Sequence, residues 1–479
     1  MLRRRLDRRL LPVQAGALLT FALLPLWDRF PRAEPAPLLL PNLNVSYFVI
    51  LLPMLWTSAA WLLAGLPGLT ALRRDPLRRL WALALLGLAL WGFASESWAF
   101  MRLDAPEVGQ SAALQLGVVA LFAVAVACAG PPPRAVVGVL AVVLLLNSAI
   151  TILQAQTQGS IGVTLLGEFE FGPDKPGVGV VQAGGVRWVR PMGLMAHPNL
   201  LAGTLVVGLL ASAALVLSAR RGVRWLGSGL FALGFWALLL TFSRAAWIGF
   251  AVGVLAVLPL LRWTLRDRAR RVQLAATVAL ALGVGAAFVA GFAPFLAARA
   301  GSGEESIELR SVADRIVYTD FALRSIGERP VLGVGIGNFP WRTSYYLVET
   351  FYDLRGDNVH NVYLSAWAEL GLVGFALLGV ALVAGLAAAF RATRGQPSPP
   401  DPLSLRERGS LESATAHWLD DRTARAALLA IAFALVVIGL LDHYPWTILH
   451  FQMLWWGGLA TAGSNRQPEL HGTIEADVN

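Results

Sequence analysis

The sequence predicts an all-α integral membrane protein with about twelve transmembrane helices and a large outer-face loop that contains an amphipathic helix. Three observations lead to this fold class: the composition, the apolar stretches and the distribution of basic residues. Of the 479 residues, 56% are hydrophobic and 14% are charged, whereas soluble proteins carry about 25% charged residues. This composition excludes an ordinary soluble enzyme. It also excludes a disordered chain, which contains few apolar residues.

Twelve stretches approach the roughly 20 apolar residues that a helix needs to cross a bilayer. They cover residues 11–27, 45–66, 79–99, 111–130, 135–153, 198–218, 224–242, 245–262, 272–297, 360–390, 425–441 and 447–463. The first stretch follows Arg3, Arg4 and Arg5 and therefore resembles a signal peptide. Because eleven further stretches follow it, an uncleaved first helix is the simpler interpretation.

The basic residues predict the orientation in the membrane. With a cytoplasmic N-terminus, 25 of the 39 basic residues but only 11 of the 30 acidic residues lie on the inner side. Cytoplasmic loops are enriched in Lys and Arg, so both termini are predicted to be cytoplasmic. The net charge of +9 then records topology and gives no support for nucleic-acid binding.

The polar segments divide the chain into transmembrane groups and two long outer loops. The predicted units are helices one to five (1–153), an outer loop (154–197), helices six to nine (198–297), a large outer loop (298–359), helices ten to twelve (360–463) with a cytoplasmic linker (391–424), and a cytoplasmic tail (464–479). In the large loop, Ser311 and Asp314 indicate a helix start. The apolar residues that follow predict an amphipathic helix over 311–326.

Familiar cofactor and metal motifs are absent from the sequence. It contains no Walker-type loop, no HExxH motif, no Cys/His cluster and no Asp-x-Asp pair, so no metal site is predicted. Cys128 is the single cysteine, so an intramolecular disulfide is impossible. The Gly333-x-Gly335-x-Gly337 run fits a tight turn better than a phosphate-binding loop, because it neither follows a strand nor has the full dinucleotide spacing.

Four cationic or titratable residues near the outer ends of the predicted helices are the candidate site: Arg190, Arg244, Arg315 and His360. A guanidinium as close to hydrocarbon as that of Arg244 is costly unless it is paired or faces a polar cavity. The alternative is an interfacial arginine that snorkels, with Ser243 capping the next helix. Taken alone, Arg190 and Arg315 fit ordinary loop charges and His360 fits an interfacial hydrogen-bonding residue.

Other polar and aromatic residues favour structural interpretations. His197, before Pro198 and Asn199, suits a helix start. The loop from Asp442 and His443 to Trp446 fits an aromatic anchor, with lining of a site as the alternative. Four aromatic residues could stack on sugars or anchor the interface: Trp188, Trp341, Tyr345 and Tyr363.

The order of these motifs resembles a known superfamily. Arg190-Pro-x-Gly193 with His197-Pro-Asn199, Thr241-x-Ser243-Arg244, Arg315, the segment Arg329 to Phe339, and His360-Asn361-x-Tyr363 with Glu369 occur in sequence over residues 185–375. This pattern is similar to that of the O-antigen ligase and O-antigen polymerase superfamily of bacterial membrane glycosyltransferases. The more N-terminal stretches match only in number and hydropathy.

The resemblance implies a function and its partners. Members move a glycan from an undecaprenyl-diphosphate carrier, on the outer face of the bacterial inner membrane, to a lipid A-core sugar (ligases) or to another carrier-linked glycan (polymerases). The shared motifs do not choose between the two branches. The resemblance also implies that Arg244, Arg315 and His360 are the catalytic residues, and that Arg190, Arg244 and Arg315 bind the diphosphate.

The chemistry of these residue types fits this activity. Guanidinium groups present planar donors to phosphate oxygens and could neutralise the charge that grows as the sugar–phosphate bond breaks. His360 could accept the proton of the acceptor hydroxyl. A single displacement at the anomeric carbon would invert it, without a metal or cofactor. Transfer of glycan to a protein and non-catalytic membrane transport are the alternative functions.

Overall fold

The computed structural model describes residues 8–26, 29–30, 47–175, 178–262, 264–300, 306–350, 357–395 and 418–464. These residues form a helical bundle, which confirms the predicted helical class. Within these ranges, nine helices are long and apolar enough to cross a membrane. They are α4 (Pro76–Ser95, continued by η2, Glu96–Trp98), α5 (Pro106–Ala129), α6 (Pro133–Thr157), α7 (Pro198–Val216), α8 (Arg221–Leu240), α9 (Arg244–Leu261), α10 (Arg268–Arg299), α13 (Val362–Arg394) and α15 (Asp421–Leu441).

The other three predicted transmembrane stretches are also helical, but they are shorter. They form α1 (Leu11–Ala22), α2 (Leu51–Leu63) and α17 (Leu449–Gly463), of 12, 13 and 15 residues. Each predicted stretch therefore contains a helix, whereas the count of twelve spans stays a prediction. The linker residues 396–417 and the tail residues 465–479 lie outside the described residues.

Further elements connect these helices. The short ones are η1 (Arg8–Leu10), α3 (Leu69–Arg74), η3 (Thr164–Leu166), η4 (Thr264–Arg266), α12 (Phe339–Thr350) and α16 (Tyr444–Thr447), and the longer α11 covers Ser306–Glu328. Two antiparallel pairs, β1 (Arg29–Phe30) with β2 (Tyr47–Phe48) and β3 (Val180–Ala183) with β4 (Val186–Val189), depart from a purely α-helical fold. The β3–β4 turn consists of Gly184 and Gly185, both at positive φ, a pairing typical of two-residue hairpins.

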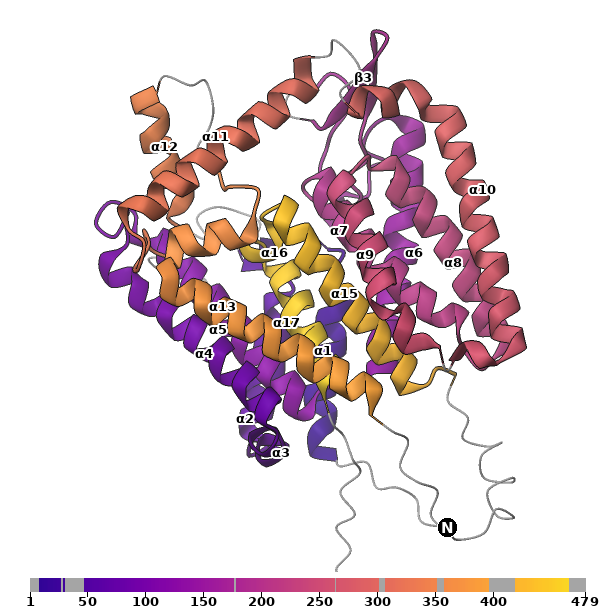
Figure 1. Ribbon diagram of the computed structural model, residues 1–479, viewed down its shortest axis with the longest axis horizontal. Coiled ribbons are helices and arrows are strands. Elements are labelled where there is room, and N and C mark those ends of the chain that lie inside the picture. Colours follow the sequence, from indigo (N-terminus) through magenta and orange to yellow (C-terminus); the bar gives the residue numbers. More distant parts are fainter. Residues whose placement is uncertain are drawn as a thin grey trace, which may run out of the picture.

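The bundle has a buried centre and apolar, exposed flanks. Figure 1 shows α4, α5 and α13 on one side, α8 and α10 on the other, and α15 and α17 between them. Every residue of α17 is buried, whereas α10 leaves most of its apolar surface exposed. An apolar helix with so little protein contact is suited to a lipid environment.

Close packing between α9 and α15 aligns their ends. A side chain at Gly249 would collide with Ile438 and the Ala434 carbonyl, and one at Gly253 would collide with the Ala430 carbonyl. Small residues of this kind let membrane helices approach closely. The antiparallel contact puts the beginning of α9 beside the end of α15, so Arg244 starts its helix at about the level where Asp442 follows its own.

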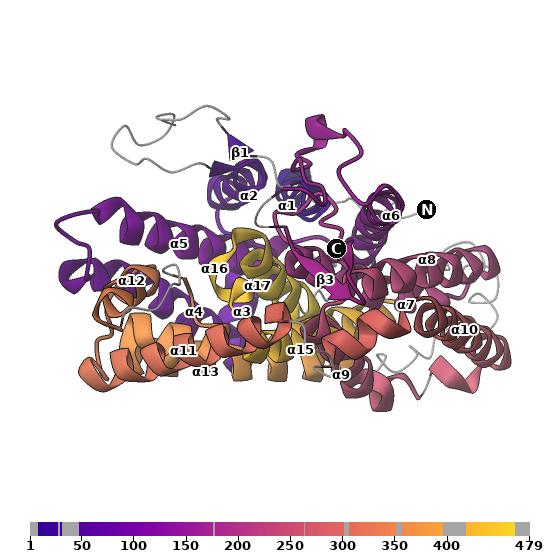
Figure 2. The ribbon, with the colours of Figure 1, turned by 90° about the horizontal axis from the view of Figure 1, so that it is seen from above.

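Helix α11 lies across one end of the bundle, from α12 toward the β3–β4 hairpin (Figures 1 and 2); this end is called the α11 end below. A helix in this segment was predicted, but its start was wrong. The helical backbone already includes Ser306, so Ser311 is an interior residue and not an N-cap. Phe321 is buried against α12 and α13 as expected, whereas Ile316 and Leu323 are 65% and 55% exposed.

A glycine-rich loop docks onto a break in α13. The break is at Gly371, whose φ of +64° is non-helical. The N–H groups of Val334 and Gly335 donate to the carbonyls of Ala368 and Glu369, at 2.9 and 2.8 Å. All three glycines of the Gly333–Gly337 run have positive φ, which confirms the predicted tight turn.

Candidate functional site

A histidine and an aspartate from two different helix ends meet at the α11 end. His360 lies just before α13 and Asp442 just after α15. Nδ1 of His360 is 3.4 Å from Oδ1 of Asp442. The aspartate side chain is 5% exposed and the histidine side chain 25% exposed, so the carboxylate is enclosed while the imidazole remains accessible.

Asn361 positions His360 against α15. Its side-chain oxygen accepts hydrogen bonds from the N–H groups of Tyr363 and Leu364 at 2.9 and 3.0 Å, which caps α13. Its amide nitrogen donates to the carbonyl of Leu440. The Tyr363 hydroxyl adds a 3.0 Å bond to the Val436 carbonyl. The beginning of α13 is therefore tied to the end of α15.

The Asp442 carboxylate accepts hydrogen bonds from three groups. Oδ1 accepts from His360 and from the N–H of His443, and Oδ2 accepts from the side-chain amide of Asn199 at 2.9 Å. Burial raises the pKa of Asp442, but the hydrogen bond from His360 and the charges of His443, His360 and His197 more than offset this, so its pKa lies well below the usual range. An ionised carboxylate only accepts hydrogen bonds, so Nδ1 of His360 carries the proton and its Nε2 is left as the basic atom.

Arg190 is linked to this carboxylate through one amide. Its Nη2 donates to Oδ1 of Asn199 at 2.7 Å, and Asn199 in turn donates to Asp442. Nε of Arg190 donates to the carbonyl of Thr241 at 2.6 Å. The arginine is 6% exposed. The guanidinium is thus fixed between the motif that contains Asn199 and the motif that contains Arg244.

Arg244 is exposed and is held by the end of α10. Its Nη1 donates to the carbonyl of Arg299 at 2.7 Å, and Nη2 of Arg299 donates to the carbonyl of Phe242 at 3.0 Å. Phe242 has a positive φ of 53°, which is strained for this residue type. Ser243 occupies the N-cap position of α9 but its side chain makes no capping bond, so the predicted capping by Ser243 is wrong. Instead, its N–H donates to the hydroxyl of Thr241.

Arg315 and Tyr318 of α11 lie beside His360 and His443. They are three residues apart and therefore share one face of the helix. The Tyr318 ring lies 6.5 Å from the His360 ring, and the charge of Arg315 acts on His443. Burial, with the charges of Asp357 and Asp314, raises the pKa of Tyr318 to about 12. This tyrosine therefore stays a neutral hydrogen-bonding group beside the histidines.

The four candidate residues thus lie around one corner of the α11 end. His360 contacts Asp442, Arg315 has an electrostatic interaction with His443, and Arg190 reaches Asp442 through the side chain of Asn199. Arg244 adjoins the loop that Arg190 binds. His197 accepts a bond from the N–H of Asn199, which confirms its expected position at the helix start.

Asp442, Asn199 and His443 are the residues that sequence reasoning did not assign to the site. Asp442 is 82 residues from His360, and no local spacing connects them. The available hint was an acidic residue next to a histidine in a short loop between two apolar stretches. The aromatic neighbours of that loop favoured an anchor, and Trp446 is indeed buried.

The same loop creates a group of potential metal ligands. Among the described residues, His360, Asp442 and His443 have ligand atoms that lie within 4.8 Å of one another. However, the Asp442 carboxylate already accepts three hydrogen bonds, and Nδ1 of His443 is 2.9 Å from the Thr447 hydroxyl. A metal ion at this position would have to displace these hydrogen bonds of Asp442 and His443, close to the positive charges of Arg190 and Arg315.

Glu369 links the elements that surround the site. Its carboxylate is buried and accepts hydrogen bonds from Trp446 Nε1, at 2.9 Å, and from the N–H groups of Gly337 and Phe339. It thereby joins the glycine-rich loop, α13 and the α15–α17 connection. We regard it as a structural residue of the site.

The aromatic candidates have separate surroundings. Trp188 packs against Phe292 and Phe295, and the Tyr363 hydroxyl binds α15. Trp341 and Tyr345 are 45% and 49% exposed. The guanidinium of Arg342 lies over the Tyr345 ring, 4.9 Å from its centroid.

Comparison with protein-family models places part of the chain in a described family. Residues 229–379 match the family model described as O-antigen ligase, which confirms the resemblance found in the motifs. The matched region includes Arg244, Arg315 and His360, whereas Arg190 and Asp442 lie outside it. No curated protein matches the chain.

Proposed function

We propose, from the membership of residues 229–379 in the O-antigen ligase family, that this membrane glycosyltransferase moves a glycan from undecaprenyl diphosphate to an acceptor hydroxyl. The observation that carries the proposal is the accessible His360 imidazole beside the buried Asp442 carboxylate, with arginines around them. We further propose that the α11 end faces the outside of the bacterial inner membrane, as the distribution of basic residues predicts.

In this mechanism the arginines receive the leaving group. The donor's diphosphate carries negative charge that increases as the glycosidic bond to phosphate breaks. Arg244 and Arg315 are partly or fully accessible and would bind its oxygens, because fixed guanidinium groups stabilise developing charge best where water is scarce. Arg190 is enclosed, so its contribution is a fixed positive charge and the alignment of Asn199.

His360 would activate the acceptor. Its Nε2 accepts the hydroxyl proton while the oxygen attacks the anomeric carbon from the face opposite to the diphosphate. The product is therefore inverted. Asp442 holds the imidazole in the tautomer that this step requires and stabilises the imidazolium that forms.

We propose that the reaction is independent of metal ions. The positive charge that a divalent cation would supply comes from arginines, and the donors on Asp442 leave its oxygens engaged. The same site serves a ligase, with a lipid A-core acceptor, or a polymerase, with a carrier-linked glycan acceptor. Transfer to a protein would use the same residues with another acceptor.

Membrane transport is the competing class of function. Transport would place polar groups on broken helices near the middle of the membrane, and α13 is indeed broken at Gly371. The acidic group beside that break, Glu369, is engaged by Trp446 and the glycine-rich loop. This arrangement favours a structural purpose for the break.

The test uses the purified full-length protein with undecaprenyl-diphosphate-linked oligosaccharide, with and without a lipid A-core acceptor. Mass spectrometry of the lipid fraction should detect acceptor with added glycan, or lengthened carrier-linked glycan. His360→Gln and Arg315→Ala should abolish the product while expression and membrane insertion are unchanged. Equal product from His360→Gln would contradict the proposed base.

A further inference from the structure

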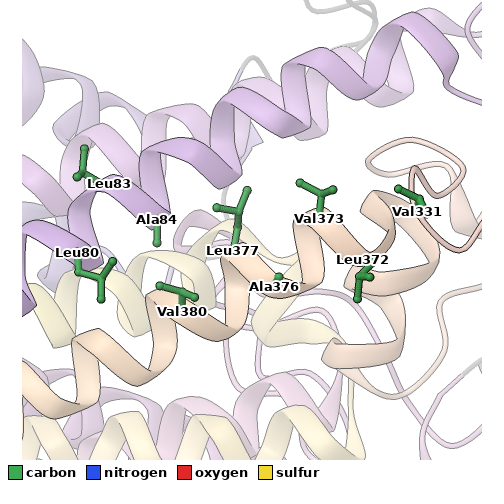
Figure 3. Close-up of a pocket in the computed structure, with 9 residues that line it drawn as sticks. All are labelled: Leu80, Leu83, Ala84, Val331, Leu372, Val373, Ala376, Leu377 and Val380. Carbon is green, nitrogen blue, oxygen red and sulfur yellow. The ribbon is translucent and has the colours of Figure 1, made fainter.

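An open apolar groove runs between α4 and α13, on the flank of the bundle. It has a volume of about 570 Å³ and is lined only by aliphatic side chains (Figure 3). Leu80 and Leu83 lie toward one end of it and Val331 at the other. Leu83 is 61% exposed and Val331 53% exposed. A cavity of this size is in the range that binds small ligands, and its lining accepts only hydrocarbon.

Two arginines and two tryptophans lie at the Val331 end of the groove. These four residues, Arg102, Arg329, Trp98 and Trp367, are called the rim below. Arg329 is two residues before Val331, and its Nη1 makes a 3.4 Å bond to the Trp98 carbonyl. Arg102 donates to the neighbouring carbonyl, that of Ser97, at 3.2 Å. Both guanidinium groups are therefore hydrogen-bonded to the short segment that follows α4, through the carbonyls of Ser97 and Trp98. Both arginines are exposed.

Two tryptophans complete the rim. Trp98 Nε1 donates to the Leu332 carbonyl and Trp367 Nε1 to the Pro330 carbonyl, both at 3.1 Å. Indole groups in this position are typical of the boundary between hydrocarbon and headgroups. The carboxylate of Glu328, next to Arg329, is engaged by Arg342 and Arg324. The rim thus has two cations above a hydrocarbon-binding groove.

We propose that this groove is a binding site for an anionic glycerophospholipid of the phosphatidylglycerol type. One acyl chain lies along α4 and α13, and the phosphodiester is bound by Arg102 and Arg329. Guanidinium groups hold phosphate oxygens with charge-assisted hydrogen bonds. The apolar groove alone would not discriminate between lipids, so the arginines supply the preference for a negative headgroup.

The position of the rim argues against the glycan donor as the occupant. The glycine-rich loop docks on α13 between the groove and His360, with bonds from Val334 and Gly335 to the α13 backbone. A phosphate bound by Arg329 therefore lies on the other side of that loop from the His360–Asp442 pair. The bound lipid would support the loop without reacting.

The experiment is native mass spectrometry of the purified full-length protein with phosphatidylglycerol, phosphatidylcholine or undecaprenyl phosphate. The groove is filled by Ala376→Phe, matched with Ala286→Phe on an exposed position of α10. The rim is neutralised by Arg102→Gln with Arg329→Gln, matched with Arg187→Gln at an exposed position of strand β4. The readout is lipid occupancy and needs no glycan transfer, so it is independent of the proposed function.

Wild-type protein should retain phosphatidylglycerol about tenfold more tightly than phosphatidylcholine, because both lipids have the phosphodiester but only phosphatidylcholine has a cation that the two arginines repel. Ala376→Phe should abolish retention, and the rim double variant should remove the headgroup preference. The matched controls should bind as wild type. Equal retention by Ala376→Phe, or equal affinity for the two phospholipids, would overturn the proposal. Preferential retention of undecaprenyl phosphate would also overturn it and would assign the groove to the donor's tail.

Discussion

The imidazole of His360 lies 3.4 Å from the buried carboxylate of Asp442, although 82 positions separate the two residues. This distance is at the long end for a hydrogen bond, and bonds of catalytic groups often shorten when substrate binds. Asp442 lies outside the region that matches the O-antigen ligase family. Its contribution to the proposed reaction is therefore open to a direct test.

Asp442→Asn should lower kcat by about 100-fold or more, the usual contribution of a positioned general base. The amide cannot hold the Nδ1 proton as an ionised carboxylate does, so the imidazole loses its tautomer and orientation. The acceptor KM should change little, because Asp442 does not touch the acceptor. Initial rates with purified substrates measure both constants. Asp421→Asn, at the opposite end of α15, is the control, and a wild-type rate in Asp442→Asn would reject the pairing.

Arg244→Ala should reduce glycan transfer by about 100-fold or more, because a fixed donor to the leaving group is lost. Arg244→Lys should restore only a small part of the activity, since one ammonium cannot replace the planar fork. Arg187→Ala, at an exposed position of strand β4, provides a control for the loss of a surface charge. Normal transfer by Arg244→Ala, at equal protein levels, would refute the proposed diphosphate contact.

Chelators should leave the purified enzyme active. The group formed by His360, Asp442 and His443 has metal-ligand atoms within 4.8 Å of one another, so the test is meaningful for this site. Activity is measured after dialysis against EDTA and after addition of Mg²⁺ or Zn²⁺. Inhibition by EDTA that either ion reverses would show that the proposed metal-free mechanism is wrong.

The stability of the folded protein should decrease as pH falls below about 6.5, the ordinary pKa of a histidine. Burial lowers the pKa of His443, against the opposing charge of Asp442, so the unfolded chain takes up a proton that the folded chain resists. The lowered pKa of Asp442 acts in the same direction but only at lower pH, because its stabilising contribution is lost as pH falls below the ordinary pKa of an aspartate. Thermal unfolding in detergent measures the slope. His443→Gln should have a shallower slope, and an unchanged slope would contradict the assignment.

Gly371→Ala should destabilise the protein by about 1–3 kcal/mol, because a residue with a side chain is strained at a φ of +64°. The new Cβ would also collide with the Val331 carbonyl. Gly379→Ala on the same helix has open space around it and should be neutral or slightly stabilising. Chemical or thermal unfolding of the two variants gives the comparison. Equal stability would show that the break does not require glycine.

Hydropathy was sufficient to predict the helices, because the backbone N–H and C=O groups of an apolar segment in lipid must form their hydrogen bonds within a helix. It could not define the ends, and it placed the start of α11 at Ser311 although the helix already includes Ser306. The β3–β4 hairpin was missed because its strands are only four residues long. Its Gly184-Gly185 turn was the available indication.

Arg244 was selected because a charge near hydrocarbon is conspicuous in a sequence, whereas Arg190, Arg315 and His360 were selected by the resemblance of their motifs to a known family. Asn199 was read only as part of a helix start, and Asp442 as part of an aromatic loop. Their connection depends on how α7, α13 and α15 pack at one end of the bundle. Long-range hydrogen bonds of this kind leave no periodic pattern in the chain.

The single amide of Asn199 has a kinetic consequence. It accepts from Arg190 with one atom and donates to Asp442 with another, so the fixed position of Arg190 is transmitted to the proposed base through Asn199 and Asp442. Under the proposed function, binding of the leaving group beside Arg190 and alignment of the base would be linked, and linkage of this type acts equally in both directions. Water is the constant competitor for an activated lipid-linked sugar. A base that is aligned only when both partners are present would protect the carrier from unproductive hydrolysis.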